Sequence, residues 1–210
     1  MTRNVSRFLF AVGILLSAAC TPAGAADEQS ASQMEFEKAT FAGGCFWCVE
    51  SFFDKTQGVI STTSGYTGGH VPNPTYEQVS TGTTGHAESV ELVFDPSKVT
   101  YSQLVDTFFK NIDPTAENQQ FHDVGTQYRT VIFYHSEEQK RLAEAAKEAL
   151  EKSGKFDKPI RTEIASAGEF YPAESYHQDY HAKNPLGYGR YSAASGRENF
   201  LKKTWGSKKD

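Results

Sequence analysis

Two cysteines, Cys45 and Cys48, lie three positions apart in the sequence, with Phe46 and Trp47 between them. A cysteine attacks as a thiolate, and the N-terminus of a helix stabilises that negative charge. Two thiols at this spacing can act in turn, because one attacks a substrate and the other then closes a disulfide with it. For Cys45 taken alone, a buried and inert cysteine is the alternative. The pair together indicates redox chemistry.

Three kinds of site compete for this Cys-x-x-Cys pair. A thioredoxin-like disulfide exchanger would have its tryptophan before the first cysteine and a small insert, whereas Phe46 and Trp47 fill the gap here. A zinc site would need His177 and His181, but these lie far from the cysteines in the sequence and form no compact four-ligand motif with them. The third possibility is a peroxide or sulfoxide reductase, in which a thiolate meets an oxidised sulfur or oxygen.

The neighbouring elements should place Cys45 where a strand passes into a helix. Residues 38–42 form a short run bounded by Gly43-Gly44, which indicates a buried strand that ends in a glycine turn. Residues 46–54 have apolar side chains at helical spacing. The two glycines would let the backbone turn sharply and leave the thiol of Cys45 uncovered.

The rest of the chain mixes strands and helices without strict βαβ alternation, so we predict an α+β fold, a two-layer sandwich of a mixed sheet and packed helices. Two helices should begin at capping sequences, Thr100 with Gln103 and Ser136 with Gln139. The expected elements are strands at 59–66, 89–94, 128–134 and 161–165, helices from Thr100, at 137–152 and at 173–183, and polar loops at 70–85 and 113–127.

The first 25 residues have the features of a secretory signal peptide. A positive start with Arg3 and Arg7 precedes a short apolar stretch at 8–19, and an A-x-A cleavage site follows at 23–25. We therefore expect an exported protein, in the bacterial periplasm or secreted. Cys20 follows a sequence that looks like a lipoprotein box with its leucine one place early, so a lipid anchor at Cys20 is the alternative to plain secretion.

After the signal peptide we expect a flexible leader at 26–35 and one domain at 36–206. The chain has 210 residues and 38% hydrophobic residues, enough for one core, and its net charge of -5 argues against nucleic-acid binding. No other stretch could span a membrane. The lysines near the C-terminus indicate a solvated tail, with a phosphate or membrane patch as the alternative: Lys202, Lys203, Lys208 and Lys209.

The chain resembles the A-type peptide methionine sulfoxide reductases in six ordered motifs between about residues 37 and 185. These are Gly44-Cys45-Phe46-Trp47-Cys48-Val49-Glu50, Ser64-Gly65-Tyr66-Thr67-Gly68-Gly69, Tyr76-Glu77-Gln78-Val79, Thr83-Thr84-Gly85-His86-Ala87-Glu88, Asp123-Val124-Gly125-Thr126-Gln127-Tyr128-Arg129 and Ala173-Glu174-Ser175-Tyr176-His177-Gln178-Asp179-Tyr180. A lone Cys-x-x-Cys is a weak signal, whereas six motifs in the family's order are specific. The resemblance implies a ferredoxin-like core.

The resemblance also implies a role for each matching residue. Cys45 matches the nucleophile that attacks the sulfoxide sulfur, and Glu88 matches the acid that protonates the departing oxygen. That acid must stay protonated near neutral pH, so Glu88 should be desolvated. Tyr66 and Tyr128 match the phenols that bind the sulfoxide oxygen, and Asp123 matches a polar residue that orients the site.

Phe46 and Trp47 match an apolar wall for the substrate methyl group. Many family members have Gly where Cys48 stands and use resolving cysteines near the C-terminus, but no cysteine follows Cys48 here. Cys48 is therefore the expected resolving thiol, and an external thiol is the alternative. The resemblance implies methionine S-sulfoxide as substrate, in oxidised proteins and as the free amino acid, no bound metal or organic cofactor, and a thioredoxin-like protein as reductant. We expect a monomer.

The residues alone leave more ordinary roles open. Glu88 could be a surface carboxylate, the tyrosines could be core residues, Phe46 and Trp47 could be helix core, and Asp123 could be a turn residue. His86 and His177 fit structural hydrogen bonds better than catalysis. A general thiol–disulfide oxidoreductase and a Cys/His metal-binding protein remain the alternatives to a sulfoxide reductase.

Overall fold

The computed structural model describes residues 35–206. The expected signal peptide, the lipoprotein alternative at Cys20 and all of the leader except Glu35 lie outside these residues, as do Lys208 and Lys209. In the part that is described, no helix is long and apolar enough to cross a membrane.

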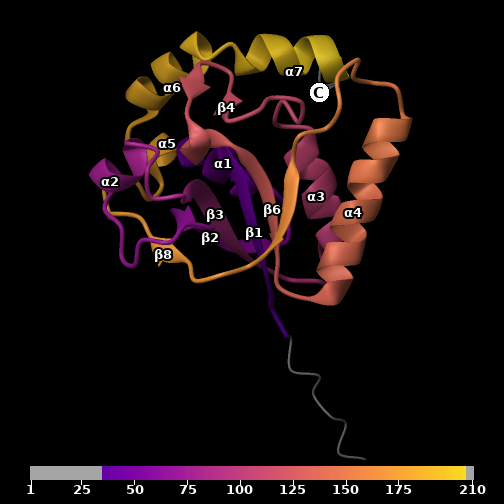
Figure 1. Cartoon of the computed structure of the whole chain (residues 1–210), viewed down its shortest axis with the longest axis horizontal. Coiled ribbons are helices and arrows are strands. Elements are labelled where there is room, and N and C mark those ends of the chain that lie inside the picture. The colour runs from indigo at the N-terminus through magenta and orange to yellow at the C-terminus, as the bar shows by residue number, and fades with distance from the viewer. Residues whose placement is uncertain (1–34, 207–210) are drawn as a thin grey trace, which may run out of the picture. The chain divides into compact units, whose positions relative to one another are not determined.

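Six strands form a mixed sheet in the order β7-β6-β1-β3-β2-β8 (Figure 1). The strands are β1 (Glu37–Gly43), β2 (Val59–Thr67), β3 (Ala87–Phe94), β6 (Thr130–Tyr134), β7 (Glu163–Ser166) and β8 (Tyr171–Pro172). Only β6 and β7 pair in parallel, and the other neighbours are antiparallel. The inner order β6-β1-β3-β2, with one helix after β1 and another after β3, is the ferredoxin-like arrangement. The predicted fold class is confirmed.

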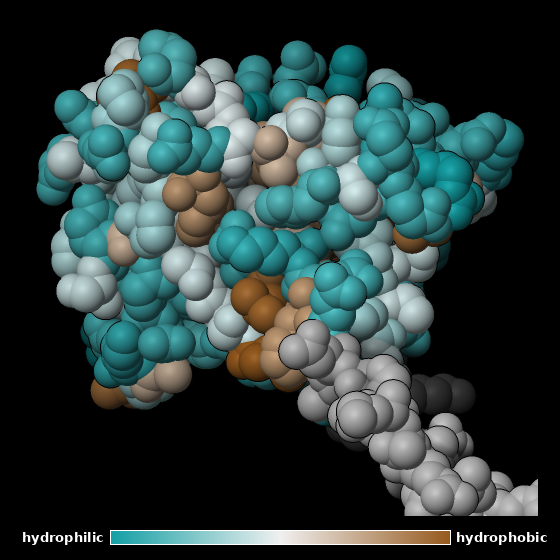
Figure 2. Space-filling model, turned by 90° about the horizontal axis from the view of Figure 1, so that it is seen from below, coloured by the Kyte–Doolittle hydropathy of each residue, from teal (hydrophilic) through white to brown (hydrophobic). Residues whose placement is uncertain are grey.

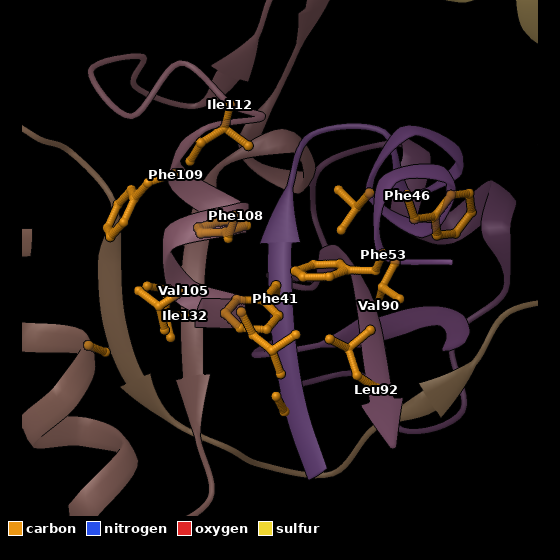
Figure 3. Close-up of a cluster of buried hydrophobic side chains, with 14 of the residues drawn as sticks. Phe41, Phe46, Phe53, Val90, Leu92, Val105, Phe108, Phe109, Ile112 and Ile132 are labelled. Carbon is orange, nitrogen blue, oxygen red and sulfur yellow. The ribbon is translucent and has the colours of Figure 1, made fainter. Parts of the chain in front are cut away.

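Three helices cover one face of this sheet: α1 (Phe46–Phe53), α3 (Tyr101–Phe109) and α4 (Glu137–Lys152). Figure 3 shows Phe41 of β1 between Phe53 and Phe108, and both ring pairs have centroids 5.0 Å apart. Side chains of a strand alternate between the faces of its sheet. Val90 and Leu92 therefore point toward the helices from β3, and so does Glu88, two residues before Val90.

The capping sequences form as predicted. Thr100 accepts a hydrogen bond from the backbone of Gln103 in a complete capping box, and Ser136 accepts one from the backbone of Gln139. The helix predicted at 137–152 has those bounds. The two segments expected to be loops are more ordered than expected, because they contain α2 (Tyr76–Ser80), the hairpin of β4 (Gln119–Gln120) and β5 (Asp123–Val124), and the 3₁₀ turn η1 (Thr126–Tyr128).

The helix expected over residues 173–183 is wrong for most of its length. β8 ends at Pro172, and only α5 (Tyr180–Lys183) is helical, after Asp179 in the left-handed conformation with φ 53°. Two helices that the sequence did not predict follow, α6 (Pro185–Ala194) and α7 (Arg197–Trp205). In Figure 1 these two helices, in yellow, cross the end of the sheet at which β1 passes into α1.

Figure 2 views the molecule from the opposite end, where β1 begins. The surface there is mostly hydrophilic, with apolar groups gathered beside the start of the described chain. A groove of about 720 Å³ at this end is lined by Phe36, Phe94 and Leu142, among others. Since Cys45 follows the last residue of β1 by two positions, this groove lies at the far end of the strand from the cysteines.

Candidate active site

Cys45 is the residue that begins α1, as predicted, and it follows a turn that needs glycine. Gly44 has φ +82°, and a Cβ there would lie 2.4 Å from Cβ of Gln120. No other residue fits without displacing the β4–β5 hairpin. The carbonyl of Cys45 accepts the first helical hydrogen bonds, from Cys48 at 3.0 Å and Val49 at 3.3 Å. The thiol of Cys45 is held against the helix start and is only 6% exposed.

Glu88 reaches the same helix start from β3. Its Oε2 accepts a hydrogen bond of 3.0 Å from the backbone nitrogen of Phe46, the residue after Cys45. The side chain is buried, and burial raises its pKa to about 8 although that hydrogen bond opposes the shift. Glu88 therefore carries a proton at neutral pH. The structure places it as the acid role requires and not on the surface.

Three tyrosines surround Glu88. Tyr66 lies directly across from it in the β2–β3 ladder, and its hydroxyl donates to Glu174 at 2.9 Å. Burial raises the pKa of Tyr66, Tyr76 and Tyr128, and the nearby charge of Glu88 raises all three further. Their hydroxyls therefore stay protonated. Tyr76 and Tyr128 can donate to an oxygen, whereas the proton of Tyr66 is engaged by Glu174 in this structure. The sequence singled out Tyr66 and Tyr128 but gave Tyr76 no role.

Phe46 and Trp47 form one aromatic cluster with His177. Phe46 is buried with its ring 5.9 Å from that of Tyr66 and 4.9 Å from that of His177, so it belongs to the core as well as to the site. Trp47 is half-buried, stacks on Tyr180 at 3.8 Å and donates from Nε1 to Nδ1 of His177 at 3.1 Å. The rings form a fixed apolar wall beside Cys45.

Asp123 lies in the β4–β5 hairpin, and its partner comes from α6. The hydroxyl of Tyr191 donates to Oδ2 of Asp123 and lies beside the thiol of Cys45. The carboxylate thus orients a phenol on the nucleophile, which is more specific than the predicted general orienting role. Tyr191 is a site residue that the sequence analysis missed.

Cys48 faces Cys45 from the next turn of backbone and is only 3% exposed. A hydrogen bond from the Cys45 thiol, the charge of Arg197 and a hydrogen bond from Tyr188 together lower the pKa of Cys48 to about 6. Burial and the charge of Asp123 oppose this shift. Burial raises the pKa of Cys45 well above its ordinary value. Burial thus opposes ionisation of Cys45, and the hydrogen bond between the two thiols favours the thiolate of Cys48.

The histidines have structural surroundings. His86 is buried, accepts from the backbone of Gly69 at 3.1 Å, and lies 2.8 Å from the carbonyl oxygen of Val71. His181 lies beside the carboxylates of Glu50 and Asp54, at 3.9 and 3.3 Å. Within residues 35–206, no group of three or more His, Cys, Asp and Glu side chains could hold a metal ion.

Besides Tyr76, four polar residues of this site were given no role from the sequence: Glu174, Tyr188, Tyr191 and Arg197. Glu174 stands in a quoted motif, and a glutamate between aromatic residues there was the available signal. It accepts from Tyr66 and, at 2.8 Å, from the backbone of Tyr76. The other three stand on α6 and α7, outside all six motifs, so neither spacing nor resemblance pointed to them.

Comparison with known proteins identifies the family of this chain. The profile of the peptide methionine sulfoxide reductase family matches residues 37–209. Among curated relatives, peptide methionine sulfoxide reductase MsrA of Bacillus licheniformis is 53% identical over 174 residues, which are 83% of this chain and 96% of that protein. The protein of the same name from Listeria innocua is 54% identical over 169 residues, 80% of this chain and 96% of that protein.

Solved structures agree with the sequence comparison. Mxr1 from Saccharomyces cerevisiae in its reduced form superposes with a TM-score of 0.69 at 35% identity, covering 73% of this chain and 88% of that one. Methionine sulfoxide reductase A of Corynebacterium diphtheriae gives a TM-score of 0.66 at 38% identity, covering 75% of this chain and 79% of that one. The chain therefore belongs to the peptide methionine sulfoxide reductase family.

Proposed function

We propose that this enzyme reduces methionine S-sulfoxide to methionine, in oxidised proteins and as the free amino acid, and so repairs oxidised proteins. The observation that carries the proposal is a buried thiol, Cys45, beside a carboxyl group, Glu88, that is protonated at neutral pH. A sulfoxide needs a thiol to attack its sulfur, an acid for its oxygen and an apolar wall for its methyl group. The preference for the S epimer rests on the family resemblance alone.

Cys45 is the nucleophile of the first step. Its thiol loses a proton as it attacks, and that proton replaces the one that Glu88 gives to the substrate oxygen. The Cys45 thiolate attacks the sulfoxide sulfur while Glu88 protonates the oxygen. Tyr128 donates a hydrogen bond to that oxygen, and Tyr66 does so once its hydroxyl turns from Glu174 to the substrate. The protonated oxygen then moves from the methionine sulfur to the Cys45 sulfur as the bond between the two sulfurs breaks, so methionine leaves and Cys45 becomes a sulfenic acid.

Cys48 resolves this sulfenic acid. Its sulfur forms a bond with that of Cys45, and the sulfenic oxygen leaves as water. A thioredoxin-like protein then reduces the Cys45–Cys48 disulfide by thiol–disulfide exchange. No metal or organic cofactor takes part in these steps, and the enzyme acts as a monomer.

An assay driven by dithiothreitol with separated sulfoxide epimers tests the proposal. We expect turnover of the S epimer only, and loss of turnover in Cys45→Ser. A Cys48→Ser enzyme should still release one methionine per active site, and mass mapping should then find the sulfenic acid on Cys45. Absence of S-epimer turnover in the wild-type enzyme would refute the proposed function. A wild-type enzyme that accumulates the sulfenic acid with Cys48 free would refute only internal resolution.

Export rests on the sequence of residues 1–25, and we propose a periplasmic or secreted enzyme with a thioredoxin-like donor in the same compartment. The N-terminal residue of the mature protein tests this proposal. Ala26 indicates cleavage after the A-x-A site and a released protein. A lipid-modified Cys20 indicates an anchored one, and an intact Met1 contradicts export.

A further inference from the structure

Arg197, the first residue of α7, is a buried cation with few partners. Its side chain is held by the carbonyl of Asn111 and, at 3.3 Å, by the carbonyl of Gly43, and its guanidinium lies 4.6 Å from the ring centroid of Phe121. The residue is only 7% exposed, and its buried Nε has no hydrogen-bond partner among the described residues. Within residues 35–206, no carboxylate lies within ion-pair distance of it.

Burying a charge without a counter-charge costs free energy of folding, so we ask which group near Arg197 its charge could stabilise. Arg197 Nη2 lies 3.3 Å from the carbonyl oxygen of Gly43 and 3.8 Å from where a Cβ on Gly44 would lie. The guanidinium therefore lies beside the turn that leads into α1. The backbone nitrogens at this end of the helix add partial positive charge of their own.

Cys48 lies in the first turn of α1, the helix that begins beside this guanidinium. The charge of Arg197 acts on Cys48 in the direction that stabilises its thiolate, and the hydroxyl of Tyr188 on α6 hydrogen-bonds the same sulfur. The carboxylate of Asp123, in the β4–β5 hairpin, acts in the opposite direction. Cys48 is buried, so water screens the attraction little. The C-terminal helices thus contribute a cation and a phenol to the cysteine pair, although no cysteine follows Cys48 in the chain.

We propose that Arg197 is a positioning residue for the second half of the reaction, which holds Cys48 ionised so that it attacks the Cys45 sulfenic acid. This inference rests on the proposed function. In the step, the Cys48 thiolate gives an electron pair to the Cys45 sulfur and the sulfur–oxygen bond breaks. The leaving hydroxide takes up the proton that Cys48 released and departs as water. Cys48 is oxidised, the Cys45 sulfenic sulfur is reduced, and no outside oxidant is needed.

A single turnover without reductant separates the two halves of the reaction. Reduced enzyme is mixed with an equal amount of methionine S-sulfoxide from pH 6 to pH 10, and released methionine, dimedone-trapped sulfenic acid and disulfide are measured by mass. In Arg197→Gln at pH 7, we expect disulfide formation to slow about tenfold more than methionine release, since one pKa unit corresponds to a tenfold change in thiolate. The lost rate should return at higher pH, and Arg197→Lys should restore much of it.

The matched control is Arg190→Gln, which removes an exposed cation from neighbouring α6 and should behave as the wild type. Disulfide formation in Arg197→Gln at the wild-type rate and pH dependence overturns the inference. Disulfide formation that is slowed equally at every pH in Arg197→Gln, and that is not restored in Arg197→Lys, also overturns the inference. That pattern indicates damaged packing and not a lost charge.

A second measurement needs no substrate. In a background with Cys20→Ala and Cys45→Ala, the ultraviolet absorbance of the thiolate reports the titration of Cys48 alone. Arg197→Gln should move the midpoint to higher pH, and an unmoved midpoint overturns the inference. If the wild-type enzyme releases no methionine, the proposed function fails, and this titration still decides whether Arg197 stabilises the Cys48 thiolate.

Discussion

At the scale of single residues, the carboxyl of Glu88 sets the pH range of the first step. Its pKa is raised to about 8 because it is buried, and the backbone nitrogen of Phe46 holds it at the start of α1. A carboxyl with this pKa is protonated below pH 8 and ionised above it. The acid function is therefore present at neutral pH and is lost as the pH rises through about 8.

We predict that methionine release in a single turnover falls above about pH 8 in the wild-type enzyme. Glu88→Gln should slow release roughly 10²–10⁴-fold at pH 7 and remove this loss at high pH, because the amide cannot give up a proton to the oxygen. Glu91→Gln is the matched control, since Glu91 lies on the same strand and pairs with Lys38 at 2.9 Å. A release rate in Glu88→Gln equal to that of the wild type would remove Glu88 from the acid role.

The residues that the sequence identified are those that carry bond-making chemistry within recognisable motifs. Cys45 and Glu88 could be found because their motifs are specific, and the structure places them together at one helix start. Tyr191 and Arg197 could not be found, because their roles depend on where α6 and α7 pack. Nothing in the local sequence of a tyrosine or an arginine tells which distant thiol it will face.

At the scale of elements, the β4–β5 hairpin and helix α6 are joined over the nucleophile. The hydroxyl of Tyr191 connects Asp123 of the hairpin to the thiol of Cys45. Burial raises the pKa of Tyr191, so the hydroxyl remains a donor. The hairpin therefore acts on Cys45 through helix α6. A substitution in either element should disturb the same contact with Cys45.

A double-mutant cycle tests this connection. Asp123→Asn and Tyr191→Phe should each slow methionine release by roughly tenfold, on the order of 1.4 kcal/mol of lost transition-state stabilisation. The double variant should be little slower than either single variant, because each substitution alone already breaks the hydrogen bond between Tyr191 and Asp123. Single-turnover release of methionine at pH 7 is the measurement. Additive losses, near a hundredfold in the double variant, would mean that the two residues act separately.

Elements with local signals were predictable and those held by distant contacts were not. The helix at Glu137–Lys152 has a capping serine and an apolar stripe, and its predicted bounds are those observed. The helix expected over residues 173–183 failed because Gln178 instead bonds the backbone of Ser64, and Asp179 adopts a left-handed conformation. Helix α6 contains Gly187 and Gly189 and few apolar residues, so tertiary contacts and not local preference stabilise it.

At the scale of the whole molecule, Glu50 in the middle of α1 is a buried carboxyl group that has no part in the proposed reaction but should make folding depend on pH. The side chain is fully buried, neither oxygen has a hydrogen-bond partner among the described residues, and burial raises its pKa to about 7. A folded-state pKa above the unfolded value means that folding favours the protonated form. The stability that this proton provides is complete below about pH 4.5 and is lost as the pH rises through about 7.

Glu50→Gln should therefore make the free energy of unfolding less dependent on pH. At pH 8 we expect the variant to be more stable than the wild type by roughly 1–3 kcal/mol, because the wild-type enzyme must bury a charge or take up a proton. At pH 4.5 the two should differ little. Urea unfolding at several pH values between 4.5 and 9 measures the difference, with Glu144→Gln on the exposed face of α4 as the control. A difference that stays constant over this range would show that folding does not raise the pKa of Glu50.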